Sequence, residues 1–157
     1  EPTQNIRSLG VKLKLNATKT TVKNKSIILI DDSLVRGTTC LKIVKMLFEN
    51  GAKEVHVRIA CPEIKYPDFY GVDMPTKEEL LAHNKTNIEM CNYINASSLK
   101  FLSLNGLYKA LIKEKRNSNY PQFSDHYFTG DYPIKPLDKI QGIKIKQLSL
   151  LSGKSNS

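Results

Sequence analysis

Cysteine is scarce in this chain, and long apolar runs are missing from it. The three cysteines, Cys40, Cys61 and Cys91, are far apart and form no Cys-x-x-Cys pair, which predicts reduced structural thiols. No apolar run is long enough to cross a bilayer, and the start shows no signal-peptide pattern. We therefore expect a cytoplasmic protein that has no membrane partner.

Aromatic residues make up only 8% of the sequence and are not interleaved with the basic residues in a stacking pattern. The formal net charge of +9 and the pI near 9.4 would otherwise suggest nucleic-acid binding. Because the basic residues are mostly scattered lysines, we expect no nucleic-acid partner. A milder consequence of the charge is attraction of anionic phosphate ligands.

The stretch most informative about function runs from four apolar residues into two carboxylates. Residues 27–30 predict a strand buried on both faces, as in a parallel α/β sheet. Ligands of such sheets lie beyond the carboxyl ends of the strands, where Asp31 and Asp32 follow. Their carboxylates can accept hydrogen bonds from ribose hydroxyls or bind a hard cation such as Mg²⁺.

The turn after these carboxylates carries groups that suit a phosphate. Gly37, Thr38 and Thr39 precede an apolar-periodic helix, and a helix N-terminus attracts phosphate through its unpaired N–H groups and its dipole. Ordinary turn and capping chemistry explains the two aspartates alone equally well. With Arg36 and these three residues attached at this spacing, a site for a phosphorylated sugar is the better interpretation.

Three motifs together resemble the family of glutamine phosphoribosylpyrophosphate amidotransferases. They are residues 31–39, 51–60 and 66–76, and the resemblance extends from Glu1 to about Pro133. It implies an α/β fold, an incomplete type I phosphoribosyltransferase fold in which a parallel sheet has flanking helices. It also implies an irregular N-terminal loop and a C-terminal tail.

The resemblance assigns roles to the residues of the first motif. Asp31 and Asp32 would be the catalytic residues and the Mg²⁺ ligands, binding the ribose hydroxyls and the metal. The substrate-binding residues would hold the 5-phosphate of 5-phosphoribosyl 1-pyrophosphate (PRPP): Ser33, Leu34, Val35, Arg36, Gly37, Thr38 and Thr39. The implied reaction transfers ammonia to C1 of PRPP, giving 5-phosphoribosylamine in de novo purine biosynthesis.

The chain divides into three predicted parts. Residues 1–25 correspond to a mobile catalytic loop, in which Arg7, Lys12 and Lys14 are either anion contacts or solvated surface residues. Residues 26–112 form the core fragment, and residues 113–157 form a linker and tail.

Within the core, spacing predicts a strand over 26–31, a helix capped by Thr38 or Thr39 and ending near Asn50, and a strand over 54–61. It also predicts capping boxes at Thr76 and Thr86. A further strand is expected over 100–103, and then a helix capped by Asn105 that ends near Lys115.

Some members of the resembled family carry an iron–sulfur cluster. Its cysteine ligands fall where this chain has Asp68 and the residues before Phe128, namely 125–127, so no cluster is expected. The loop over 66–75 is either a packed cover of the sheet edge or a border of the nucleotide and substrate cavity. We assign no role to His56, His83 or His126, since no metal-ligand spacing or catalytic partner is evident.

The family's glutaminase domain, the early strands of its fold and its pyrophosphate loop are absent from this sequence. One interpretation is an enzyme portion that needs a separate glutaminase or N-terminal half, binds PRPP and purine nucleotides, and forms a homo-oligomer when intact. The alternative is a noncatalytic remnant or binding module, and a purine-salvage phosphoribosyltransferase is a weaker third choice. An exposed sheet edge, with low stability or self-association, is expected in either case.

Overall fold

The computed structural model describes residues 19–72 and 76–134. Arg7, Lys12, Lys14 and the predicted tail beyond residue 134 lie outside these ranges. The elements follow in the order α2 (Lys19–Val22), β1 (Ser26–Asp31), α3 (Thr38–Glu49), β2 (Glu54–Ile59), η1 (Lys77–Glu79), α4 (Leu81–Asn84), α5 (Asn87–Tyr93), β3 (Ser98–Phe101), α6 (Leu104–Ile112) and α7 (His126–Thr129).

The three strands form one parallel sheet in the order β1-β2-β3. Ile27 is level with Val55 across the first pair, and Val57 is level with Leu99 across the second. The predicted strand–helix–strand unit is therefore confirmed. A helical crossover of this kind is the usual way of joining neighbouring parallel strands.

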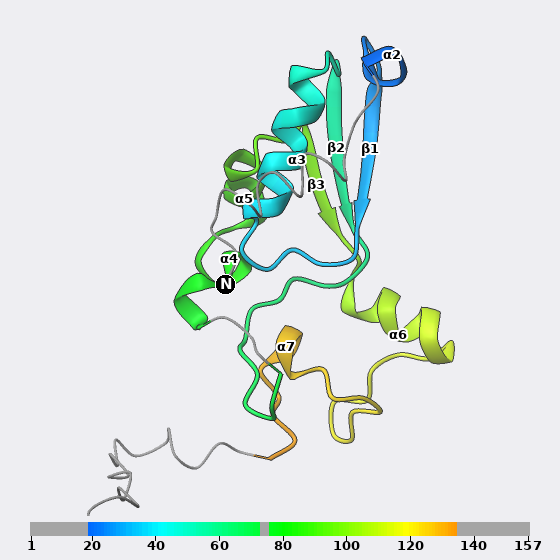
Figure 1. Cartoon of the computed structure of the whole chain (residues 1–157). Coiled ribbons are helices and arrows are strands. Elements are labelled where there is room, and N and C mark those ends of the chain that lie inside the picture. Colours follow the sequence, from blue (N-terminus) through cyan, green and yellow to red (C-terminus); the bar gives the residue numbers. More distant parts are fainter. Residues whose placement is uncertain (1–18, 73–75, 135–157) are drawn as a thin grey trace, which may run out of the picture.

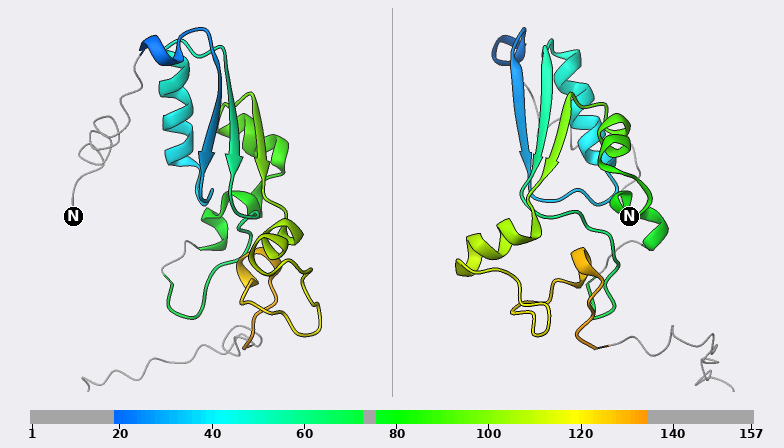
Figure 2. Two further views of the ribbon diagram at one scale, coloured as in Figure 1. Left: turned by 90° about the vertical axis from the view of Figure 1, so that its right-hand side faces the viewer. Right: turned by 180° about the vertical axis from the view of Figure 1, so that it is seen from behind.

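One face of the sheet is covered by helices. Figures 1 and 2 show α3 and α5 on the same side of the three strands. The alternate residues Val55, Val57 and Ile59 of β2 are buried on that side, as are Val44 of α3 and Met90 of α5. This apolar layer is the core, and it fixes which side chains of each strand point inward.

The other face of β1 is open, so the prediction of a strand buried on both faces is wrong. Ile28 and Ile30 are 65% and 73% exposed, because no helix of the described ranges covers that side of the sheet. Within these ranges β1 also pairs with β2 alone. The expected exposed sheet edge is therefore confirmed for this part of the chain.

Several element boundaries differ from the sequence-based expectation. The strand β3 spans Ser98–Phe101 rather than residues 100–103, because its register with β2 places Leu99 in the core. Helix α6 is capped by Ser103, whose Oγ accepts a hydrogen bond from the Gly106 N–H at 3.0 Å, and not by Asn105. It ends at Ile112.

The capping boxes at Thr76 and Thr86 are both present. The first opens only the 3₁₀ turn η1, and the second opens helix α5. A short helix, α2, also lies in the stretch that was expected to be irregular.

The cysteines are free thiols. Burial raises the pKa of both Cys40 and Cys61 to about 11, so they stay neutral near pH 7 and have little nucleophilic character. In the described ranges, no helix combines the length and apolarity that a membrane span requires.

Candidate functional site

The loop between β1 and α3 encloses a cavity of about 320 Å³ at the carboxyl end of the sheet. Every residue assigned to the site from sequence contributes to its lining, which runs from Asp31 to Cys40. Figure 1 shows this loop crossing from the end of β1 to the start of α3. The position matches the general rule that ligands of open α/β sheets lie beyond the strand ends.

The acidic end of the cavity is formed by two neighbouring carboxylates. Asp31 is half-buried and Asp32 is exposed. Oδ1 of Asp31 accepts a hydrogen bond from the Asp32 N–H at 3.0 Å, and Oδ1 of Asp32 accepts one from the Ser33 hydroxyl at 3.3 Å. These contacts leave each side chain a second carboxylate oxygen for a ligand.

The donor set at this end fits Mg²⁺. No cluster of three or more His, Cys, Asp or Glu side chains suited to a metal exists in the described ranges. Mg²⁺, however, is commonly held by one or two carboxylates together with water and substrate phosphate oxygens. Asp31 and Asp32 supply that number of hard oxygen ligands.

The opposite end of the cavity is the N-terminus of α3. The N-cap residue is Gly37, with φ +75°, and it offers no side-chain cap, so the prediction that Thr38 or Thr39 caps this helix is wrong. Both threonines are exposed at the cavity instead. The first turn of α3 carries no acidic residue, which leaves the positive end of the helix dipole available to an anion.

Glycine is required at position 37 for two reasons. The positive φ disfavours any side chain, and a Cβ there would lie 2.7 Å from Cδ2 of Leu81 and 3.0 Å from Cε1 of Tyr93. The loop is therefore pressed closely against the helices α4 and α5, and the motif glycine permits that approach.

A second segment, residues 76–81, holds this loop from outside the motif. The Val35 carbonyl accepts a hydrogen bond from the Leu81 N–H at 2.9 Å, and Nε of Arg36 lies 3.2 Å from Oε1 of Glu79. Sequence reasoning identified Glu79 only as part of a capping box. Nothing in the residue pattern indicated that it would face an arginine 43 positions earlier.

A buried carboxylate–imidazole pair lies away from the cavity. Oδ1 of Asp68 is 2.9 Å from Nε2 of His126, and the two side chains are only 1% and 2% exposed. Oδ2 of Asp68 accepts hydrogen bonds from the N–H groups of Tyr70 and Val72 at 2.8 Å. Nδ1 of His126 lies 3.0 Å from the Ser124 hydroxyl.

These contacts control the ionisation of Asp68. Burial by itself would raise its pKa, but the hydrogen bonds from Val72, Tyr70, His126 and Tyr127 together outweigh burial and lower the pKa to about 2. Asp68 is therefore a carboxylate at neutral pH. It joins the loop after β2 to helix α7.

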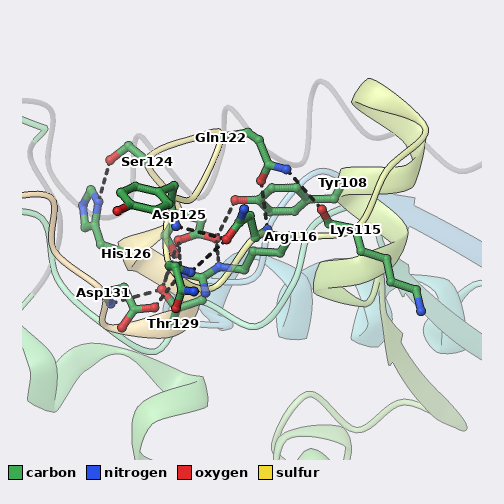
Figure 3. Close-up of polar contacts among 12 residues, drawn as sticks. Tyr108, Lys115, Arg116, Gln122, Ser124, Asp125, His126, Thr129 and Asp131 are labelled. Carbon is green, nitrogen blue, oxygen red and sulfur yellow. Dashed lines mark hydrogen bonds and ion pairs between the residues drawn. The ribbon is translucent and has the colours of Figure 1, made fainter.

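The segment before α7 is held by Arg116, whose side chain is 11% exposed (Figure 3). The guanidinium of Arg116 contacts both carboxylate oxygens of Asp125, with Nε to Oδ2 at 2.5 Å, and its Nη2 contacts Asp131 at 2.5 Å. Tyr108 of α6 donates its hydroxyl to the same Asp125 oxygen at 2.8 Å. The chain after α6 is thus packed back against that helix.

The loop over 66–72 therefore packs on the C-terminal segment. The Tyr127 carbonyl accepts hydrogen bonds from the N–H groups of Lys65 and Tyr66, and the Tyr132 hydroxyl donates to the Pro67 carbonyl at 2.9 Å. None of its described residues lines the Asp31–Cys40 cavity. This packing holds the described part of the loop against α7 and the residues that follow it. It also gives His126 a partner, Asp68, that the sequence pattern did not reveal.

The chain is similar to known amidophosphoribosyltransferases. An amidophosphoribosyltransferase of Rhizobium etli is 54% identical over 153 residues, which cover 97% of this chain and 31% of that protein. One from Staphylococcus aureus is 48% identical over 133 residues, covering 85% of this chain and 27% of that protein. The chain thus spans less than a third of the length of these curated relatives. No protein-family model matches it.

Solved structures of the same family share the fold. A glutamine PRPP amidotransferase from B. subtilis, complexed with ADP and GMP, superposes with a TM-score of 0.71 at 44% identity, over 85% of this chain and 29% of that one. A structure described as the allosteric regulatory enzyme of purine biosynthesis gives 0.70 at 45% identity, over 85% and 28%. The chain belongs to the amidophosphoribosyltransferase family, in which it corresponds to the C-terminal part.

Proposed function

We propose that this chain is the PRPP-holding portion of an amidophosphoribosyltransferase. The observation that carries the proposal is the cavity lined by Asp31–Cys40, which has two carboxylates at one end and a helix N-terminus at the other. These two chemistries suit the two ends of a 5-phosphorylated ribose, its vicinal hydroxyls and its phosphate.

In the proposed binding mode, Asp31 and Asp32 accept hydrogen bonds from the ribose hydroxyls and ligate Mg²⁺. The Mg²⁺ ion, when bound, would neutralise the pyrophosphate as it departs. The 5-phosphate lies against the loop from Ser33 to Thr39, where the N–H groups of α3 and the exposed hydroxyls of Thr38 and Thr39 are donors. The same loop excludes bulk water from one side of the sugar.

The reaction proposed for the intact enzyme is displacement at C1 of PRPP. Nitrogen of ammonia forms a bond to C1 as the C1–oxygen bond to pyrophosphate breaks, and the resulting ammonium loses a proton to give 5-phosphoribosylamine. The carboxylates of Asp31 and Asp32 stabilise positive charge that develops on the ribosyl ring. Catalysis by this part rests on positioning and electrostatics, without a covalent protein intermediate.

The proposed partners follow from the family. A glutaminase portion, in the same protein or as a separate chain, would supply the ammonia. Purine nucleotides would bind, as ADP and GMP do in the B. subtilis structure. Homo-oligomer formation is proposed for the intact enzyme.

The second candidate is a noncatalytic module that holds PRPP without turnover. An ammonia-dependent assay of pyrophosphate release separates the two. Release above the rate without protein supports the enzyme portion, whereas binding without release supports the module.

The site assignment is tested by replacing both carboxylates, Asp31→Asn together with Asp32→Asn. PRPP and Mg²⁺ should raise the melting temperature of the unmodified chain, because a ligand that binds only the folded state stabilises it. We expect the double variant to keep its melting temperature without ligand and to lose the ligand-induced rise. The control variant is Glu49→Gln with Glu114→Gln, whose side chains are exposed and lie outside the cavity. This variant should retain the ligand-induced rise in melting temperature. An unchanged rise in the Asp31/Asp32 variant would contradict the assignment.

A further inference from the structure

Residues 76–81, which lie outside the cavity lining, make three contacts with the loop that forms it. They are the backbone hydrogen bond from Leu81 to Val35, the close approach of the Leu81 side chain to Gly37, and the contact of Glu79 with Arg36. The first two fix the backbone of the loop. The third acts on Arg36, the one cationic side chain among the described residues that line the cavity.

The carboxylate of Glu79 is shared between two donors. Its Oε1 lies 3.2 Å from Nε of Arg36, and its Oε2 accepts a hydrogen bond from the Thr76 N–H at 3.2 Å. The hydrogen bond from Arg36, followed by that from Thr76, lowers the pKa of Glu79. The carboxylate is therefore ionised at neutral pH, and the capping box orients it toward the arginine.

The exposure of this ion pair limits what it can do for stability. The side chains of Arg36 and Glu79 are 53% and 47% exposed, and pairs exposed to this degree contribute little to the free energy of folding. The contact uses Nε of Arg36, whereas a guanidinium carries four further N–H groups on its two terminal nitrogens. The contact at Nε therefore orients the guanidinium and leaves its four terminal N–H groups available to a ligand.

We propose that Glu79 is a positioning residue, which holds Arg36 so that its terminal N–H groups meet an anionic phosphate in the Asp31–Cys40 cavity. This inference rests on the proposed function and adds a residue to its site from outside the motif. Glu79 itself touches no substrate in this arrangement. It acts through the orientation of Arg36, and its capping box supplies the rigidity that orientation needs.

The chain provides a matched control in its second capping box. Glu89 accepts a hydrogen bond from the Thr86 N–H at 2.7 Å at the start of α5, and this capping box has the same arrangement of residues as that of Glu79 with Thr76. Among the described residues, the side chain of Glu89 accepts hydrogen bonds from Thr86 alone and contacts no arginine. Glu79→Gln and Glu89→Gln therefore remove one carboxylate charge each from equivalent caps, but only the first removes a partner of Arg36.

The test is calorimetric titration of the full chain and its variants with PRPP in excess Mg²⁺. We expect Glu79→Gln to weaken PRPP binding by about two- to tenfold, in the range seen for coupled neighbours, and Glu89→Gln to leave it unchanged. In the background of Arg36→Gln, Glu79→Gln should have no further effect. Glu79→Asp, which retains the charge, should restore part of the affinity.

The outcomes separate this inference from the proposed function. Equal PRPP affinity of the Glu79→Gln and Glu89→Gln variants would overturn the role of Glu79. The same holds if Glu79→Gln weakens PRPP binding just as much when Arg36 is already replaced. Either result would leave PRPP binding by the unmodified chain intact, so the proposed function would stand. Failure of the folded, unmodified chain to bind PRPP would overturn the proposed function and this inference with it.

Discussion

Asp68 shows at the scale of a single residue how this chain joins segments that are distant in sequence. Its side chain accepts hydrogen bonds from its own loop and contacts His126, 58 positions later. A buried carboxylate is costly unless it is fully paired. Asp68 meets that condition, so the loop after β2 and helix α7 depend on one another.

The ionisation of Asp68 predicts a loss of stability in acid. Its pKa in the folded chain is about 2, below the ordinary value of 3.8, so the stabilisation is complete above pH 4 and is lost as the pH falls toward 2. We expect the melting temperature of the unmodified chain to fall more steeply over this window than that of Asp68→Asn. Melting temperatures are measured by circular dichroism at each pH. An equal fall for the unmodified chain and Asp68→Asn would contradict the role given to Asp68.

The residues of the cavity were predictable from sequence, whereas the partners of Asp68 and Glu79 were not. Asp31 to Thr39 are contiguous, so a local pattern of strand, carboxylates and helix start identifies them. The contacts of Arg36 with Glu79 and of Asp68 with His126 span 43 and 58 positions. Such contacts depend on how the chain folds back, which local patterns do not encode.

At the scale of elements, a continuous apolar run predicted β1, and apolar spacing predicted α3 and β2. The strand β2 ends at Ile59, two residues earlier than expected. The predicted burial of both faces of β1 was wrong, because an apolar run does not determine whether both faces of a strand are covered. Sequence reasoning also misplaced the start of α6. Ser103 and Asn105 are both favoured N-cap residues, and only the backbone geometry decides between them.

The corrected cap of α6 gives a prediction for two neighbouring residues. Ser103→Ala removes the hydrogen bond from the Gly106 N–H and should lower the free energy of unfolding by about 1 kcal/mol, a typical cost for an N-cap. Asn105→Ala lies inside the helix, where alanine is the better helix former, and should not destabilise it. Urea unfolding of both variants measures the difference. A larger loss for Asn105→Ala would show that the cap is misassigned.

At the scale of the whole molecule, the described sheet has one helix-covered face and one open face (Figure 2). The open side of β1 combines exposed isoleucines with an edge that no strand of the described ranges pairs. Exposed apolar surface and unpaired strand edges favour association between chains.

This arrangement predicts concentration-dependent self-association of the chain. Ile28→Thr with Ile30→Thr keeps the β-branched shape while reducing the apolar surface, and should shift the sedimentation profile toward monomer. The control is Ile88→Thr, which replaces an isoleucine of α5 that is 74% exposed on the other side of the molecule's core layer. It should leave the profile unchanged. A monomeric, sharp and reversible melt of the unmodified chain would contradict the prediction.

The central claim is that the cavity after β1 holds a phosphorylated ribose together with Mg²⁺. The most direct measurement is calorimetric titration of the unmodified chain with PRPP, once in Mg²⁺ and once in a chelator of divalent cations. The account predicts saturable binding near one PRPP per chain that depends on Mg²⁺. A folded sample that gives no binding heat at several temperatures, and no melting-temperature rise with PRPP and Mg²⁺, would contradict it.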